Sequence, residues 1–267
     1  MKGIELGARF SLATSRLHYC GAEGADRVLY EALVRGADLE STTGVLRTFE
    51  ALMPYLEAIA LHTGGDPFDS EVVEAYWIGG EALRDFTREE FQGLLDRLVQ
   101  RGLPRSVARR LAERLPANPI PHHLFHVSFV GVGEVTGHVE TTLANMQACR
   151  PGWAEVRSVQ DRRLTISEPQ LTLQEGKYSI GLPVVRDVTY DPALVPEVRP
   201  GQTVALHWDW PVGVLSGEQV ARLRATSQMS LEVANEARGS PPLRGGEHAK
   251  PGPRGEAIPK RGSPVRG

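Results

Sequence analysis

One cysteine and one histidine, far apart in the chain, are of the types that bind a soft or borderline metal ion. Cys149 lies in ANMQACRPGWAEV beside Arg150, and a neighbouring cation in a loop favours the thiolate, the form that binds metals. His207 lies in the stretch TVALHWDW. If this stretch is a strand, His207 and Asp209 share a face, where the carboxylate can hydrogen-bond the imidazole and fix its tautomer. The alternative for a lone cysteine is a small buried apolar residue.

Three histidines close together form a second candidate site. PHHLFHV contains His122, His123 and His126. In a strand, His122 and His126 would share one face and His123 would point to the other. The spacing HExxH is missing, so a metal ion would need further ligands from elsewhere, such as Cys149. The cluster therefore predicts either a metal-binding protein or metal-dependent enzyme, or histidines that only form hydrogen bonds on an edge strand.

Motifs of the common enzyme classes are missing from the sequence. There is no GxSxG elbow, no GxxxxGK[ST] phosphate loop and no GxGxxG after a strand. The glycine-rich stretch GVGEVTG lacks the lysine and the strand–turn–helix context of a phosphate loop. We therefore name no catalytic residue and favour a non-enzymatic protein.

Charge and cysteine content narrow the partners and the compartment. The chain of 267 residues has a net charge of −3, and residues 236–267 carry seven basic and three acidic side chains, which leaves the first 235 residues at −7. An acidic body argues against nucleic acid as a partner. Two cysteines cannot form a disulfide framework, and no run is apolar enough for a signal peptide or a membrane span. We expect a cytoplasmic protein with reduced thiols and no membrane partner.

The first half of the chain has the period of amphipathic helices. The clearest lies over 87–101, where Thr87 and Glu90 fit a capping box and Gly102 fits a C-terminal cap. Pro54 falls inside another periodic stretch and should kink or split it. The expected helices are 24–36, 42–62 with its break at Pro54, a run through Val72, Val73 and Tyr76, 87–101 and 105–115.

Beyond the prolines of 116–121 the apolar period falls to two. Short alternating runs between Gly, Pro, Asp or Gln are typical of strands in a small barrel or meander; they are HHLFHVSFVGV, AEVRSV, LTISEP, KYSIGL and TVALHW. In HWDW, Trp208 and Trp210 would pack in the core, opposite His207. A helix is expected over about 138–148, and a second capping box, Ser216 with Gln219, predicts a closing helix.

The order of features from Cys149 onward resembles the hydrogenase-assembly chaperones of the HypC/HupF family. A cysteine, the turn Pro151-Gly152, a strand, VRPGQTVALHWDW and the helix LSGEQVARL follow one another. In that family a cysteine opens a small barrel, a strand ends in histidine and a helix closes the domain. The resemblance implies that Cys149 and His207 hold iron or a client during delivery of the iron centre to nickel–iron hydrogenases. The stretches HYCG, DPFDSEVVEAYWIGG, PHHLFHV and LHWDW also resemble a bacterial family of hydrogenase-associated proteins.

Together these observations predict an α+β protein. We expect a helical domain over 1–118, a small OB-like β-barrel with a closing C-terminal helix over 119–235, whose chaperone-like portion is 149–235, and a disordered tail rich in Gly and Pro over 236–267. The expected function is that of a non-enzymatic accessory protein in hydrogenase maturation, which binds the large subunit or another maturation protein through Cys149, His207 and Asp209. Iron would be its transient cofactor. The alternative is a metal-binding protein or enzyme that uses His122, His123 and His126.

Overall fold

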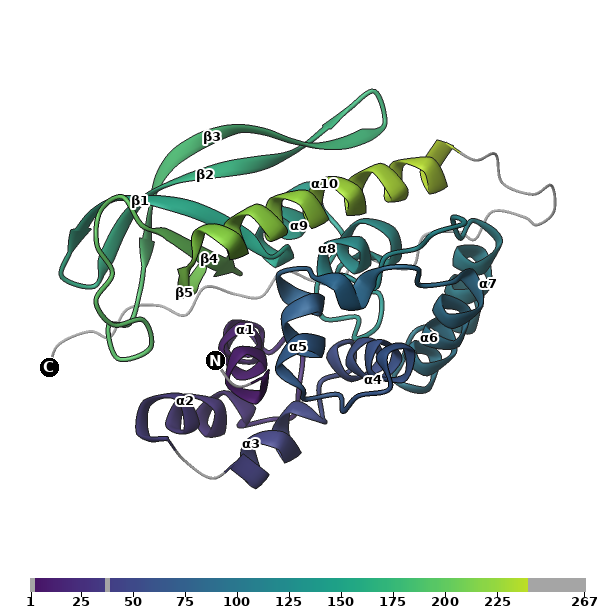
Figure 1. Ribbon diagram of the computed structural model, residues 1–267, viewed down its shortest axis with the longest axis horizontal. Coiled ribbons are helices and arrows are strands. Elements are labelled where there is room, and N and C mark those ends of the chain that lie inside the picture. The colour runs from purple at the N-terminus through teal and green to yellow at the C-terminus, as the bar shows by residue number, and fades with distance from the viewer. Residues whose placement is uncertain (1–2, 37–38, 240–267) are drawn as a thin grey trace, which may run out of the picture.

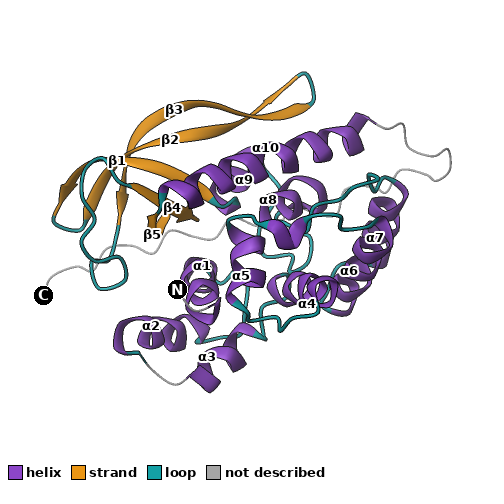
Figure 2. Cartoon of the chain, viewed as in Figure 1, coloured by secondary structure: helices purple, strands orange, loops and turns teal. Residues whose placement is uncertain are grey.

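The computed structural model describes residues 3–36 and 39–239. One antiparallel sheet lies beside a larger group of helices, and the long last helix runs from the sheet over the helical part (Figure 1, Figure 2). The helices are α1 Gly3–Arg16, α2 Ala25–Arg35, α3 Leu39–Leu46, α4 Leu52–Thr63, α5 Ser70–Trp77, the 3₁₀ turn η1 Glu81–Leu83, α6 Arg88–Gln100, α7 Arg105–Glu113, α8 His123–Phe125, the π-helix η2 His126–Gly131, α9 Leu143–Cys149 and α10 Gly217–Gly239. None in the described part is long and apolar enough to cross a membrane.

Most helix predictions are confirmed. The Thr87–Glu90 capping box is formed at the start of α6, and Ser216 and Gln219 form the reciprocal bonds of the second box before α10. The stretch 42–62 does split, but upstream of Pro54, between α3 and α4. Pro54 lies in the first turn of α4, where its missing N–H group costs no helical hydrogen bond. The sequence analysis did not predict α1, which is buried on most sides.

The strands form one open sheet. They are β1 Gly152–Gln160, β2 Arg163–Gln174, β3 Lys177–Thr189, β4 Thr203–His207 and β5 Trp210–Leu215, in the order β3-β2-β1-β4-β5. Every neighbouring pair is antiparallel.

The expected OB-like barrel is wrong. Barrel closure requires the two edge strands to pair, and no ladder joins β3 to β5 among the described residues. The strands also differ in length, since β3 has 13 residues and β5 only six. The β2–β3 ladder continues outward as a hairpin to Gln174 and Lys177, where the shorter strands cannot follow. Alternation predicted β1 to β4, but it did not predict β5, and it carries no information about whether the sheet closes.

Helical and sheet parts share one hydrophobic core. A single cluster of buried side chains contains Phe10 and Phe91 from the helices and Val156 and Val204 from the sheet. α10 packs against both α8 and β3. The division at residue 118 stays a prediction. Of the predicted disordered tail, residues 236–239 form the end of α10, and 240–267 lie outside the described residues.

Candidate metal centre

The register of the sheet brings Cys149 and His207 together. Cys149 is the last residue of α9 and His207 the last of β4. β1 starts three residues after Cys149, and its first residue, Gly152, pairs with Leu206. The antiparallel direction therefore sets the end of α9 beside the end of β4. A hydrogen bond of 2.5 Å from the Trp208 amide to the Ala148 carbonyl joins the two segments again.

His123 completes a group of three metal-binding side chains. One ligand atom from each of His123, Cys149 and His207 lies within 4.8 Å of the others, and all three residues are buried. Cys149 Sγ is 3.5 Å from His123 Nε2. A tetrahedral zinc ion with ordinary bond lengths would separate a sulfur and a nitrogen ligand by about 3.6 Å. The group is thus close to the spacing that a metal ion needs.

A hydrogen bond at Nδ1 orients each imidazole and leaves its Nε2 for a metal ion. His207 Nδ1 lies 2.6 Å from the Phe10 carbonyl oxygen, which only accepts, so Nδ1 carries the proton and Nε2 the lone pair. His207 Nε2 is buried and has no hydrogen-bond partner among the described residues. His123 Nδ1 lies 2.7 Å from the Tyr76 hydroxyl, which leaves Nε2 facing the thiol. Such outer bonds orient the histidines of known metal sites.

Burial keeps the three side chains uncharged at neutral pH. Desolvation lowers the pKa of His207 to about 4. It also lowers the pKa of His123 well below its usual value, and the nearby His207 lowers the pKa of His123 further. Neutral imidazole is the form that binds metals. Burial, and to a lesser extent Cys20, raises the pKa of the Cys149 thiol. Trp208 lowers this pKa and so partly opposes the shift. A bound metal ion would deprotonate this thiol, because coordination favours thiolate.

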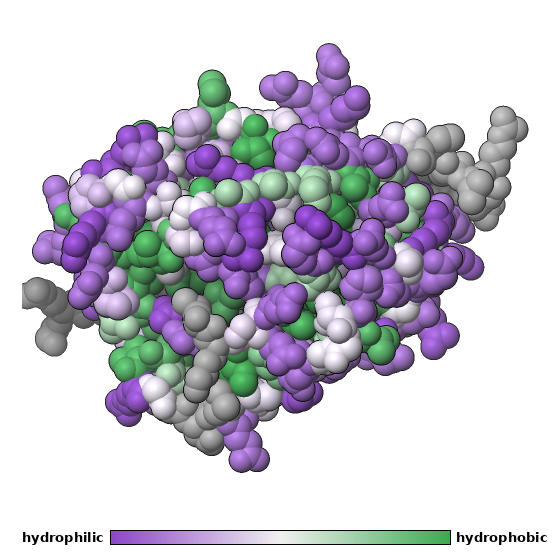
Figure 3. All heavy atoms as spheres, viewed as in Figure 1, coloured by the Kyte–Doolittle hydropathy of each residue, from purple (hydrophilic) through white to green (hydrophobic). Residues whose placement is uncertain are grey.

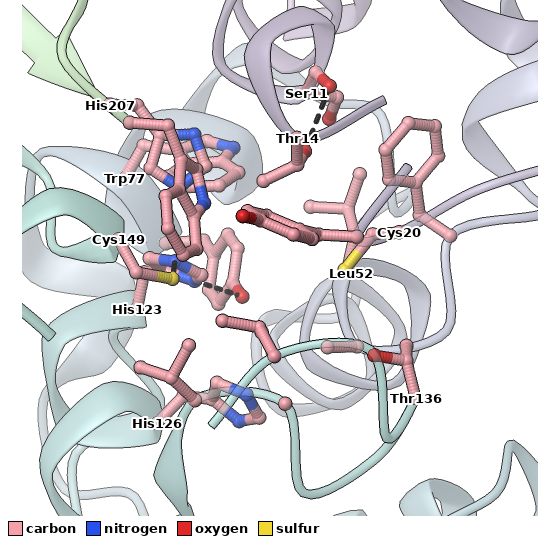
Figure 4. A pocket seen from close by; sticks show the side chains of 18 residues that line it. Ser11, Thr14, Cys20, Leu52, Trp77, His123, His126, Thr136, Cys149 and His207 are labelled. Carbon is pink, nitrogen blue, oxygen red and sulfur yellow. Dashed lines mark hydrogen bonds between the residues drawn. The ribbon is translucent and has the colours of Figure 1, made fainter. Parts of the chain in front are cut away.

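The three side chains lie on one wall of a pocket. Figure 4 shows them on one side of the pocket, with Cys20 and Thr136 on the other. The pocket encloses about 530 Å³ between atoms, including space open to solvent, and is lined largely by aromatic and apolar side chains. On the outer face in Figure 3, hydrophilic side chains cover most of the surface, and the larger hydrophobic areas lie between the sheet and helices α1 and α2. The candidate ligands are therefore inside the protein, in an apolar setting.

The two candidate sites of the sequence analysis merge in part. His123 belonged to the histidine cluster and here lies with Cys149 and His207. His126 lines the same pocket, but its Nδ1 is 3.1 Å from the Tyr55 hydroxyl. His122 is outside the group, and its Nδ1 accepts a bond from the Leu124 amide at 3.3 Å.

Asp209 is not a partner of His207. Its carboxylate is mostly exposed and bonds Arg186 at 2.6 Å. The expected His–Asp pair required a strand through HWDW, but β4 ends at His207. Trp208 and Asp209 form the two-residue turn to β5. Their φ angles are 51° and 62°, and this type of hairpin turn requires positive φ at both positions. Trp208 therefore lines the pocket instead of sharing a face with Trp210. Asp209 is a common residue in such turns but Trp208 is not, so HWDW was interpreted as a continuous strand.

The expected strand over HHLFHVSFVGV is also wrong. The segment forms α8 and the π-helix η2. Residues three apart share a helical face, so His123 and His126 both reach the pocket, with ring centroids 5.9 Å apart. The three-residue spacing of His123 and His126 was the signal in the sequence that could have indicated a shared helical face. The sequence analysis missed Tyr76 and the Phe10 carbonyl, because only the fold brings them beside the histidines.

Comparison with known proteins identifies the family. The model of DUF6390, a family of unknown function, matches residues 1–240. The chain belongs to the DUF6390 family. No curated protein and no solved structure matches this DUF6390 protein. The family match does not bear on hydrogenase assembly, so the resemblance to the assembly chaperones stays a prediction.

Acid should destabilise the metal-free protein. Burial lowers the pKa of His122 to about 3 and of His126 and His207 to about 4, against about 6.5 in an unfolded chain. The unfolded state therefore binds more protons below pH 6.5, and stability falls as pH drops from there toward 4. We expect each of these histidines to lower the free energy of unfolding by roughly 2 kcal/mol between pH 7 and pH 5.

Urea unfolding at several pH values measures this effect. His126→Gln keeps a hydrogen-bonding side chain beside Tyr55 but does not titrate, so the variant should show a shallower pH dependence. An unfolding free energy that stayed constant between pH 7 and pH 5 would show that the histidines are not held neutral.

Proposed function

We propose that this DUF6390 protein binds one divalent transition-metal ion through His123 Nε2, Cys149 Sγ and His207 Nε2. The observation that carries the proposal is the buried Nε2 of His207, which has no hydrogen-bond partner in the described part of the chain, while its Nδ1 is fixed by the Phe10 carbonyl. A buried acceptor left without a partner costs about 1–3 kcal/mol. A metal ion would supply that partner and use the neighbouring thiol as a second ligand.

The ligand set selects the kind of metal. A thiolate with two imidazoles suits zinc, iron or copper and is a poor match for magnesium or calcium, which prefer oxygen. Three protein ligands leave a fourth position open toward the pocket, as in sites where zinc binds a water molecule or a substrate. A thiol ligand must stay reduced, which agrees with the cytoplasmic location that the two lone cysteines favour.

Metal loading of protein purified without a histidine tag tests the proposal. We expect one Zn²⁺ per chain. At a free Zn²⁺ concentration one hundred times Kd, the melting temperature should rise by about 5–10 °C, because the folded state alone has the site. The His122→Gln variant should bind Zn²⁺ like the wild type, since His122 lies outside the group. Stoichiometry well below one, or no thermal shift, would contradict a metal site.

A role in hydrogenase maturation is a second candidate. The observation in its favour is that Cys149 and His207, the two residues matched to the assembly chaperones, adjoin the same pocket. The Cys149 side chain is buried, so we propose that the pair holds iron before transfer and does not dock a client surface directly. Fe²⁺ binding, and a hydrogenase large subunit that co-purifies with the wild type but not with Cys149→Ala, would support this role. A large subunit retained equally by both proteins would contradict it.

A further inference from the structure

The pocket around the proposed metal ion has no charge of its own to balance the ion. Among the described residues, no Asp, Glu, Lys or Arg lines it. A divalent ion with one thiolate and two neutral imidazoles carries a net charge of about +1. An unbalanced charge in apolar surroundings is costly. A fourth ligand with one negative charge would make the complex neutral.

The same pocket offers hydrogen-bond donors that lack acceptors. Ser11 Oγ, Trp77 Nε1 and Trp208 Nε1 are buried without a partner among the described residues, and all three side chains line the pocket. An indole N–H group can only donate, so its missing partner must be an acceptor.

Both indoles are close to the proposed ligands. The Trp77 ring lies 4.4 Å from the His123 ring and 5.1 Å from the His207 ring, measured between centroids. Trp208 follows His207 in the chain, and its indole lies close enough to the Cys149 thiol to lower the pKa of that thiol, although no hydrogen bond forms between them. Donors next to the metal position favour a ligand that has acceptor atoms.

Among the described residues that line the pocket, Cys20 is the second thiol, and it is poorly suited to be the ligand. It lies on the opposite wall (Figure 4) and outside the group of three whose ligand atoms are close. Among the described residues, no further Cys, Asp or Glu lies with the group of three, so the balancing charge would come from outside the chain.

We infer that the fourth position of the metal takes a small exogenous monoanion with acceptor atoms, such as a carboxylate or azide. The anion binds the metal and accepts hydrogen bonds from Trp208 Nε1 and Ser11 Oγ. This inference rests on the proposed metal site.

Co²⁺-loaded protein provides a spectroscopic test. The Co²⁺ visible spectrum is recorded first without anion, then during titration with sodium azide and sodium formate. We expect saturable, one-to-one spectral changes with both anions. Formamide, a neutral molecule of the size of formate, should cause no change at the same concentrations. Trp208→Phe or Ser11→Ala should weaken azide binding about tenfold, since each removes a hydrogen bond to a charged ligand.

Trp210→Phe is the matched control. Trp210 lies in the same hairpin and also has a buried, unpartnered Nε1, but it does not line this pocket, so azide affinity should not change. If Trp208→Phe fails to fold, Ser11→Ala and the formate–formamide comparison still decide the question. Normal Co²⁺ binding without any response to anions overturns this inference alone. Loss of Co²⁺ binding in Cys20→Ser would make Cys20 the fourth ligand and overturn it too. Absence of Co²⁺ binding in the wild type overturns the metal site itself.

Discussion

Replacing Cys149 with serine should weaken Zn²⁺ binding at least about 100-fold, because loss of a direct ligand must exceed the 10–100-fold cost of losing an outer-shell partner. The thiolate is the only charged ligand of the three, and Zn²⁺ binds a thiolate far better than a hydroxyl group. Serine is close in size to cysteine, so the fold should tolerate the change. Competition with a chromophoric chelator measures the affinity.

Cys20→Ser is the matched control for this result. Cys20 is the other free cysteine in the described chain, and it lines the same pocket. Because it lies outside the group of three, its replacement should leave Zn²⁺ affinity unchanged within about threefold, less than the effect of an outer-shell partner. Equal loss in the two variants would mean that Cys20 is also a ligand of the metal ion. Unchanged affinity in Cys149→Ser would exclude Cys149 as a ligand.

Replacing Glu168 with glutamine should destabilise the fold by about 3–5 kcal/mol, because it leaves a buried charge unpaired. The Arg150 side chain is fully buried, 3.6 Å from Glu168, whose own side chain is 3% exposed. Glu168 also bonds Arg186 at 2.7 Å. Burial lowers the pKa of Arg150 to about 10, and Glu168 opposes that shift. Thermal unfolding of metal-free protein should show a drop of about 10 °C or more.

Asp187→Asn is the matched control for Glu168→Gln. Asp187 is also on the sheet, but its ion pair with Arg163 has both side chains about half exposed or more. Exposed pairs contribute about 0–1 kcal/mol, so the variant should unfold near the wild-type temperature. Similar melting temperatures for the two variants would show that the Arg150–Glu168 pair is not required for stability. The pair matters for the site because Arg150 directly follows Cys149.

Local patterns in the sequence predicted local structure well. The capping box at Thr87 and the apolar period after it predicted α6, and alternation predicted strands β1 to β4 but not β5. Closure of the sheet could not be predicted, because it depends on strand lengths and on pairing between residues distant in the chain. The barrel was therefore wrong although four of its five expected strands are present.

The candidate site was predicted in part, for a similar reason. Residue chemistry singled out Cys149 and His207, and sheet register places them together. Strand alternation placed Asp209 on the same face as His207. This placement was wrong, because the chain turns at Trp208 and Asp209 with positive φ angles. His123 was assigned to a separate cluster, since a strand over 122–126 would not direct it toward Cys149. Tyr76 and the Phe10 carbonyl orient the imidazoles only through tertiary packing.

X-ray absorption at the zinc edge tests the metal site most directly. Untagged wild-type protein is loaded with one equivalent of Zn²⁺ and measured beside Cys149→Ser. We expect one sulfur ligand at about 2.3 Å and two imidazole nitrogens at about 2.0–2.1 Å in the wild type, with the sulfur missing in the variant. A wild-type spectrum without sulfur, or with only oxygen ligands, would contradict the site formed by His123, Cys149 and His207.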